Sequence, residues 1–112
     1  MPEKSIRILE QMMDVAAFRN KVLTSNIANA DTPGYKAKDI SFQEEMEKAV
    51  SSDGKSEYNI YESGTTMSER DGNTVNLDIE MAKVAENTLI YDTAAQLMVM
   101  KIRMKKNVLS AP

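Results

Sequence analysis

Residues 25–35 read SNIANADTPGY, and this segment divides the chain. Pro33 and Gly34 are the first proline and glycine after a long stretch that contains neither. Proline also disfavours helical geometry in the residue that precedes it. The pattern predicts a long N-terminal helix that ends near Ala30 and is followed by a turn.

The polar residues of this segment have two interpretations. Asn26 and Asn29 lie three residues apart and therefore share one face of the helix. In the first interpretation, their amides bind carbonyl groups freed at the helix end, and Gly34 supplies the positive φ of the turn. In the second, the paired amides form hydrogen bonds across a contact between subunits. The residues alone leave both open.

Apolar residues of the N-terminal segment recur at intervals of three and four. A repeat of 3.5 residues is typical of helices that supercoil around a partner. Asn20 is the polar member of this stripe, and in that position it would set the register of pairing at some cost in stability. The stripe consists of Ile6, Leu9, Met13, Ala16, Asn20, Leu23, Ile27 and Ala30.

A second helix is predicted from Leu77 to Leu109. Asn76 is its expected N-cap, and Asp78 and Glu80 place negative charge in the first turn, where the helix dipole favours it. Two adjacent stripes give it a wide apolar face, so it should contact more than one neighbour. The stripes are Leu77, Met81, Val84, Thr88, Tyr91, Ala95, Met98, Ile102, Lys105 and Leu109, and Ile90, Ala94, Leu97, Met104 and Val108.

The middle of the chain is less regular. Ser41 precedes a segment with capping-box spacing, which predicts a short helix over residues 42–50. Three turn clusters follow between residues 51 and 76, where only Tyr58 and Ile60 hint at a strand. We therefore predict a mainly α fold: an N-terminal heptad helix in 1–32, a connecting segment in 33–76 with a short third helix and an irregular part, and a C-terminal heptad helix in 77–112.

The composition excludes most chemistry. The 112 residues include no cysteine or histidine, which removes disulfides, thiolate metal sites and imidazole catalysis. A net charge of -3 argues against a nucleic-acid surface. No apolar run is long enough to span a bilayer, and the N-terminus lacks the apolar stretch of a signal peptide.

Individual motifs for chemistry also fail. Residues 54–56 (GKS) resemble the end of a phosphate-binding loop, but Ala49 stands where that loop needs glycine. Residues 69–73 (ERDGN) suggest a calcium loop, but Met67 and Asp78 occupy its two end positions. Neighbouring carboxylates are better explained as dipole partners, and the nine methionines as packing at helix interfaces. We expect no catalytic, cofactor-binding or metal-binding residues, and no enzyme.

A family resemblance rests on residues 26–35, NIANADTPGY, at the end of a heptad helix. This run resembles the signature of the bacterial flagellar rod and hook axial proteins. Residues 36–42 (KAKDISF) and 71–81 (DGNTVNLDIEM) are similar to the proximal-rod members in particular. The resemblance covers about residues 10–50 and 70–109. It implies a structural subunit of the flagellar basal-body rod, which joins the membrane ring to the hook and transmits torque.

The resemblance also implies how such a subunit assembles. The terminal helices would form an antiparallel coiled-coil hairpin and pack against neighbouring copies, other rod subunits, and ring or export-gate proteins. Subunits would leave through the flagellar type III system without a cleaved signal and lie on the periplasmic side of the basal body. The matching assembly motif is Asn26, Asn29, Thr32, Pro33, Gly34 and Tyr35; the expected coiled-coil interface is Ile6, Leu9, Met13, Asn20, Leu23 and Ile27 with Leu77, Met81, Val84, Tyr91, Met98 and Ile102.

Two alternatives remain at this point. A paralogous distal-rod or hook subunit would share the motif, although such chains are generally longer. A cytoplasmic helical adaptor or flagellar export chaperone would bind a partner helix in a methionine-lined groove. A chaperone should be a stable soluble dimer. A rod subunit should be partly disordered when dilute and should polymerise when concentrated.

Overall fold

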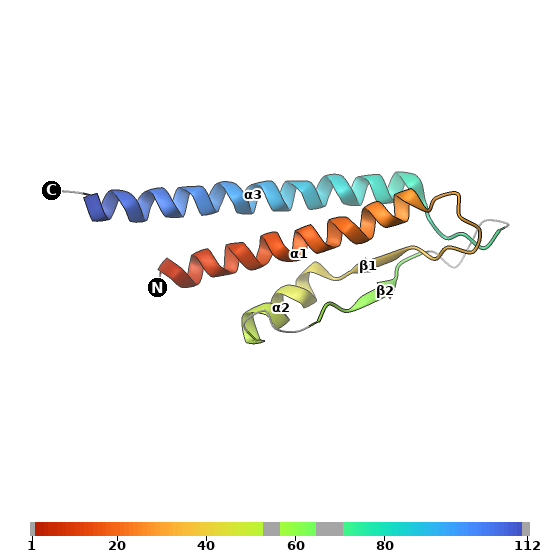
Figure 1. Cartoon of the computed structure of the whole chain (residues 1–112), viewed down its shortest axis with the longest axis horizontal. Helices are drawn as coiled ribbons and strands as arrows, with labels where there is room; N and C mark the ends of the chain where they lie inside the picture. Colours follow the sequence, from red (N-terminus) through yellow and green to blue (C-terminus); the bar gives the residue numbers. More distant parts are fainter. Residues whose placement is uncertain (1, 53–56, 65–70, 111–112) are drawn as a thin grey trace.

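The computed structural model describes residues 2–52, 57–64 and 71–110. Two long helices form the body of the molecule, and a short helix with a two-stranded sheet lies between them in the chain (Figure 1). This confirms the prediction of a mainly helical fold with long terminal helices and a short third one. The elements are α1 (Pro2–Ala28), β1 (Lys38–Ile40), α2 (Phe42–Ser52), β2 (Ile60–Glu62) and α3 (Leu77–Ser110).

Helix α1 ends where its hydrogen bonding changes. The amide of Ala30 donates to the carbonyl of Ile27 at 3.2 Å, which is the tighter i−3 spacing. The chain then enters the turn at Pro33 and Gly34. The helix therefore stops two residues before the predicted end at Ala30.

The predicted caps are confirmed. The side-chain oxygen of Asn76 accepts a hydrogen bond from the amide of Ile79 at 3.2 Å, at the start of α3. The hydroxyl of Ser41 accepts one from the amide of Glu44 at 3.3 Å, at the start of α2. Both caps satisfy amides that a helix leaves unpaired in its first turn.

The small sheet was only partly anticipated. Strands β1 and β2 pair antiparallel, with Asp39 opposite Tyr61 and Ile40 opposite Ile60. Strand β2 includes Ile60, but Tyr58 precedes it. Strand β1 was missed, because three residues that include a lysine and an aspartate carry no alternating pattern.

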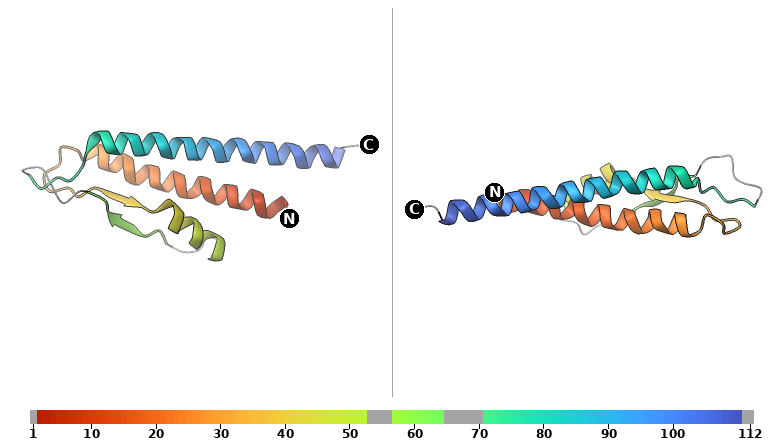
Figure 2. Two further views of the ribbon diagram at one scale, coloured as in Figure 1. Left: turned by 180° about the vertical axis from the view of Figure 1, so that it is seen from behind. Right: turned by 90° about the horizontal axis from the view of Figure 1, so that it is seen from above.

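Helix α1 is the central element. Helix α3 packs along one side of it, and β1 with α2 packs on the other (Figures 1 and 2). Asn87 of α3 contacts Ala16, and Glu80 contacts Asn26, so the two long helices run in opposite directions. The molecule is 69 × 26 × 16 Å, and the end of α3 extends beyond the start of α1 (Figure 1). None of the described helices is both long enough and apolar enough to cross a membrane.

The buried core is thin and centred on α1. Its apolar members are Leu9, Val15, Ala16, Leu23, Ala37, Ile40, Ala49 and Ala94. The side of α3 that meets α1 carries buried Glu80, Asn87 and Ala94, which are seven residues apart. Alanine and asparagine are short, so the helices can approach closely there.

The expected interface residues differ in exposure within the single chain: seven of the twelve are buried or half-buried, and five are exposed. On α1, Leu9 and Leu23 are buried, Ile6, Met13 and Ile27 are half-buried, and Asn20 is exposed. On α3, Val84 and Met98 are half-buried, whereas Leu77, Met81, Tyr91 and Ile102 are exposed. The paired polar groups of Asn26, Glu80 and Asn87 therefore select the face of α3 that meets α1, and they leave much of the longer apolar stripe uncovered.

Candidate assembly site

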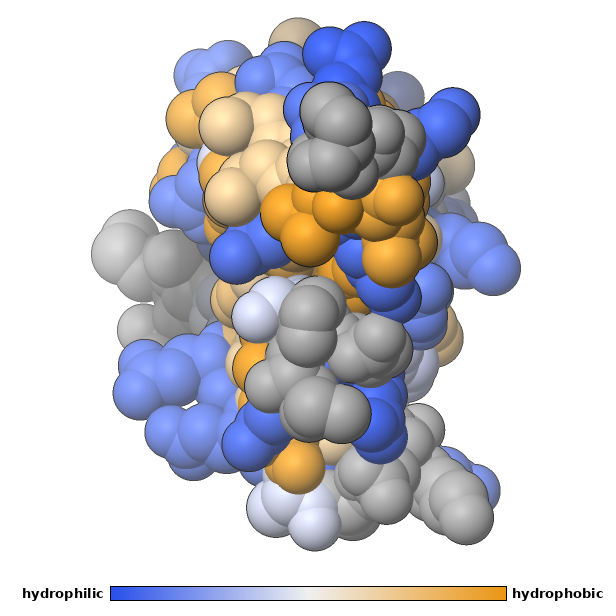
Figure 3. Space-filling model, turned by 90° about the vertical axis from the view of Figure 1, so that its left-hand side faces the viewer, coloured by the Kyte–Doolittle hydropathy of each residue, from blue (hydrophilic) through white to orange (hydrophobic). Residues whose placement is uncertain are grey.

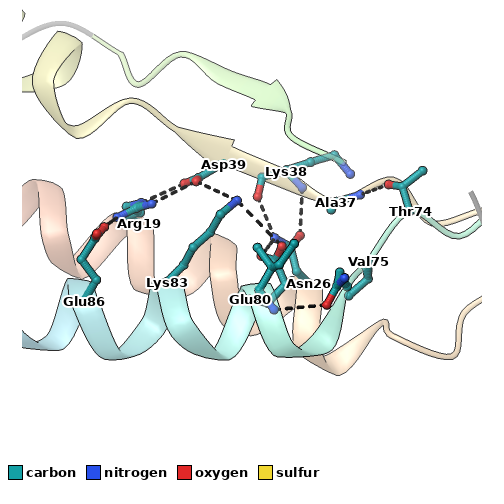
Figure 4. Close-up of polar contacts among 12 residues, drawn as sticks. Arg19, Asn26, Ala37, Lys38, Asp39, Thr74, Val75, Glu80, Lys83 and Glu86 are labelled. Atoms are coloured by element: carbon teal, nitrogen blue, oxygen red, sulfur yellow. Dashed lines mark hydrogen bonds and ion pairs between the residues drawn. The ribbon is translucent and has the colours of Figure 1, made fainter. Parts of the chain in front are cut away.

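Asn26 joins three elements at the end of α1 (Figure 4). Its Nδ2 donates to the carbonyl of Lys38 and to Oε1 of Glu80, both at 2.7 Å. Its Oδ1 accepts from the amide of Lys38 at 3.0 Å and from the hydroxyl of Tyr35 at 3.1 Å. The side chain is fully buried, so its amide ties α1 to β1 and α3 within one chain.

Asn29 acts locally. Its Nδ2 donates to the carbonyl of Ser25 at 2.8 Å, one of the carbonyls at the helix end. Its Oδ1 accepts from the hydroxyl of Thr32 at 3.0 Å. The first interpretation fits Asn29 in part, because the Ser25 carbonyl that it binds also accepts from the Asn29 backbone amide at 3.1 Å. Asn26 instead binds the carbonyl of Lys38 and the carboxylate of Glu80.

Asn73 closes the turn from the other side. Its Nδ2 lies within hydrogen-bonding distance of the carbonyls of Asn29, Ala30 and Thr32, at 2.8 to 3.1 Å. Its Oδ1 accepts from the amide of Val75 at 2.7 Å. A buried side chain from the approach to α3 therefore satisfies the end of α1, and the two helix termini are held together.

Gly34 and Gly72 form the turn itself. Gly34 has a φ of 76° and Gly72 a φ of 82°, which confirms the expected positive φ of Gly34. The amide of Gly34 donates to the carbonyl of Asp71 at 2.8 Å, and the amino group of Lys36 donates to the carbonyl of Gly72. The Pro-Gly turn is thus bound to the segment that leads into α3, while Pro33 is exposed.

Tyr35 connects the turn to the sheet. Besides Asn26, its hydroxyl lies 3.3 Å from the hydroxyl of Ser25. The amino group of Lys38 lies 4.7 Å from the centre of its ring, a cation–π contact. Its carbonyl accepts from the amide of Thr74 at 3.1 Å. Tyr35 therefore bridges α1, β1 and the segment that leads into α3.

A buried ion pair lies farther along α1, where α1 packs against β1 and α3 (Figure 4). Arg19 donates to both carboxylate oxygens of Asp39, at 2.9 and 3.1 Å, and to Glu86 at 3.3 Å. The amino group of Lys83 lies 3.4 Å from Asp39. Arg19 is 8% and Asp39 2% exposed. A bidentate pair between α1 and β1 is thereby flanked by two charges from α3.

The ion pair shifts the pKa values of Asp39 and Arg19. Burial raises the pKa of Asp39, but the hydrogen bonds from Arg19 and the Ile40 amide, with the charges of Arg19 and Lys83, outweigh it and hold that pKa below its ordinary value. The hydrogen bond with Asp39 raises the pKa of Arg19, against the opposing effect of burial. Both residues therefore stay charged at neutral pH.

The sheet and α2 are secured to α1 by a smaller set of contacts. The rings of Phe18 and Tyr58 stack with centroids 4.2 Å apart. Buried Glu45 accepts from the amide of Asn59 at 2.9 Å and pairs with Lys48 at 2.9 Å. These contacts join the segment before β2 to α1 and to α2, and Gln11 of α1 donates to the carbonyl of Ala49 in α2 at 3.1 Å.

The polar groups described above bind one another across α1, β1 and the start of α3. Among residues 2–52, 57–64 and 71–110, no group of three or more acidic side chains is placed to hold a metal ion. The charged groups between α1, β1 and α3 are paired with each other. This arrangement fixes how the end of α1, the sheet and the start of α3 lie relative to one another.

The sequence interpretation missed part of this site. Arg19, Asp39 and Asn73 were not predicted, and Glu80 was expected only as a dipole partner. Asn73 follows a turn pair, Asp71-Gly72, which was a usable signal for a capping asparagine. Arg19 and Asp39 are 20 residues apart and belong to no motif, so the sequence gave no such signal for them.

The motif segment matches a known family. Residues 13–36 match the family described as flagella basal body rod protein. The chain is 37% identical to flagellar basal body rod protein FlgB of Bacillus subtilis (strain 168), over 95% of this chain and 93% of the relative. It is 34% identical to FlgB of Aeromonas hydrophila (89% and 88%) and 30% identical to FlgB of Escherichia coli strain K12 (97% and 95%).

These matches define the class as structural proteins of the flagellar basal-body rod, which is not a class of enzymes. The similarity extends over nearly the whole of both chains and includes the short helix and sheet as well as the terminal helices. Within that class, the chain belongs to the FlgB family.

Proposed function

We propose that this chain is a proximal-rod subunit that polymerises through its terminal helices. The observation that carries the proposal is the apolar surface of α3, because soluble monomers rarely expose large contiguous apolar patches. The large apolar side chains that α3 leaves exposed are Leu77, Ile79, Met81, Leu89, Tyr91, Leu97, Val99, Met100, Ile102, Met104, Val108 and Leu109.

The two long helices would act as one antiparallel coiled-coil hairpin. The contact between the two helices would be formed by Leu9 and Leu23 of α1 and by Val84 and Met98 of α3. Their burial supports this, because all four are buried or half-buried. The uncovered stripe at Leu77, Met81, Tyr91 and Ile102 would meet neighbouring subunits. Residues 1–32, 33–76 and 77–112 would then form a single assembly domain.

The motif would set the angle at which this hairpin leaves its turn. Asn26, Tyr35 and Gly34 bind three different elements, which supports a role in orienting α1, β1 and α3 before assembly. The partners would be copies of the chain, other rod subunits and ring or export-gate proteins. Export would proceed through the flagellar type III system without a cleaved signal.

A complementation experiment tests the proposal. The gene is deleted, and swimming and basal bodies, viewed by electron microscopy, are scored after expression of each variant. Met81→Glu and Ile102→Glu, on the exposed stripe, should abolish rods while leaving the helical circular dichroism spectrum unchanged. Gln96→Glu, at an exposed polar site of the same helix, is the matched control. Intact rods in the deletion strain, or in both stripe variants, would reject the proposal.

A further inference from the structure

The last turns of α3 form a basic and apolar projection. Every residue from 99 to 109 is exposed, and this end of α3 extends past the start of α1 (Figure 1). Figure 3 views this end of the molecule, where hydrophobic surface lies directly beside hydrophilic surface. The sequence contains no aspartate or glutamate after Asp92, but it contains four cations: Lys101, Arg103, Lys105 and Lys106.

A straight ridge runs along this projection. Met100, Met104 and Val108 are spaced by four residues and are 55%, 59% and 76% exposed. Lys101 and Lys105 follow the same spacing one residue later, so they lie along the side of the ridge. We call Met100, Met104 and Val108 the tail ridge.

Helix α2 carries an apolar ridge with the same spacing, and the charge beside this ridge is negative, opposite to that of the tail. Phe42, Met46 and Val50, here called the α2 ridge, line a shallow hollow of about 580 Å³ together with Gln43 and Glu47. Val50 is 52% exposed. Glu47 is exposed as well, so a negative charge lies at the edge of this hollow.

We propose that the tail ridge of one copy packs on the α2 ridge of a second copy. Ridges of i±4 spacing interlock in the commonest mode of helix packing, and the lysines beside the tail ridge would face Glu47 beside the α2 ridge. The inference rests on the proposed polymerisation and names two of its surfaces.

The chain's own tail is not the occupant. Helix α1 lies between α2 and α3, and the end of α3 projects away from both (Figures 1 and 2). The contact is therefore between copies and joins two different surfaces. Such a heterologous contact repeats from copy to copy, and it generates an open helical polymer where the rotation between copies does not close into a ring.

Engineered cysteines test this arrangement cleanly, because the chain contains none of its own. Met46→Cys and Met104→Cys proteins are mixed at a concentration that allows polymerisation, oxidised mildly, and run on a non-reducing gel. Mixed dimers are expected, and each protein alone should give far fewer. The double variant should give a ladder of oligomers. Glu44→Cys, exposed on another side of α2, replaces Met46→Cys in the control and should lose the mixed product.

Charge reversal provides a second measurement. Glu47→Lys, or Lys101→Glu with Lys105→Glu, should weaken association about two- to fivefold, the range of exposed ion pairs, and the combination should restore it. Circular dichroism of each variant should be unchanged, because these side chains are exposed. Restoration distinguishes a direct contact from general loss of solubility.

Three outcomes would overturn the proposal. One is a Met46–Met104 product no stronger than the Glu44–Met104 control. Another is predominant dimers of each single variant, which indicate a symmetric contact. The third is binding of the tail to vesicles of phosphatidylcholine and phosphatidylglycerol without cross-linked product, which indicates a lipid surface. The cysteine variants are also expressed in the deletion strain, and swimming is scored separately. If they restore swimming but give no cross-linked product, the proposed contact fails while the proposed function stands.

Discussion

Replacing Asn26 by alanine should be the most damaging single change in the motif. The substitution removes a buried amide and leaves the amide and carbonyl of Lys38 and the carboxylate of Glu80 without that partner. A buried polar group that loses its hydrogen bond costs about 1–3 kcal/mol. Tyr35 retains the hydroxyl of Ser25, so its loss is small. The expected destabilisation is about 3–5 kcal/mol, a large part of the total stability of a small domain.

The matched control is Asn29→Ala, three residues away in the same motif. Asn29 is half-buried, and within the described part of the chain its side chain hydrogen-bonds to Ser25 and Thr32, so its loss should cost about 0.5–1.5 kcal/mol. Urea unfolding of both variants, followed by circular dichroism, measures the difference. A double-mutant cycle of Asn26→Ala with Glu80→Ala should show a coupling energy of about 1–3 kcal/mol. Equal costs for the two asparagines, or no coupling, would refute the reasoning.

Three further changes address the turn, the ion pair and the sheet. Gly34→Val should abolish rod assembly, because a β-branched residue at a φ of 76° is strained by about 1–3 kcal/mol, whereas Gly34→Asn should be tolerated; normal swimming of the valine strain contradicts this. The pKa of Asp39 in the folded protein lies below its ordinary value of 3.8, so its ion pair stabilises the fold fully above that pH, and this stabilisation is lost as the pH falls from there through the folded-state pKa. Asp39→Asn should therefore lower stability at neutral pH and flatten the acid side of a plot of unfolding free energy against pH. An unchanged acid side would exclude the pair with Arg19 as the cause. Gly64→Ala should destabilise by about 1–3 kcal/mol, because a Cβ there would overlap both Oγ1 and Cβ of Thr74; Thr74→Ala keeps that Cβ and loses the hydrogen bond from the Ala37 amide, so it should not recover the loss, and melting temperatures of the single and double variants check this.

The elements that could be predicted from the sequence are those with local causes. The Pro33-Gly34 breaker ends α1, Asn76 and Ser41 cap the other helices, and Gly34 takes a positive φ. Each of these depends on residues within about one helical turn. The absence of cysteine and histidine likewise limits the function through composition alone, because thiol and imidazole chemistry need those side chains wherever they lie in the fold.

The site depended on contacts between distant residues. Asn26 and Glu80 are 54 residues apart, and Arg19 and Asp39 are 20 apart. No periodicity marks such pairs, because hydrogen bonding of one polar side chain to another depends on where the chain returns in space. The same holds for β1, whose three residues are a strand only because β2 lies beside them.

The sequence by itself determined two long helices, their caps, the turn and the exclusion of side-chain catalysis by thiol or imidazole. Only the tertiary structure decided which face of α3 meets α1. The heptad pattern marked stripes of apolar residues, and the structure buries Ala94 from them together with Glu80 and Asn87, which the pattern did not mark. The amide groups of Asn87 and Asn26 donate across this contact to Ala16 and Glu80, and short side chains permit the helices to approach closely there. The stripe that was left exposed is the surface on which the proposed assembly depends.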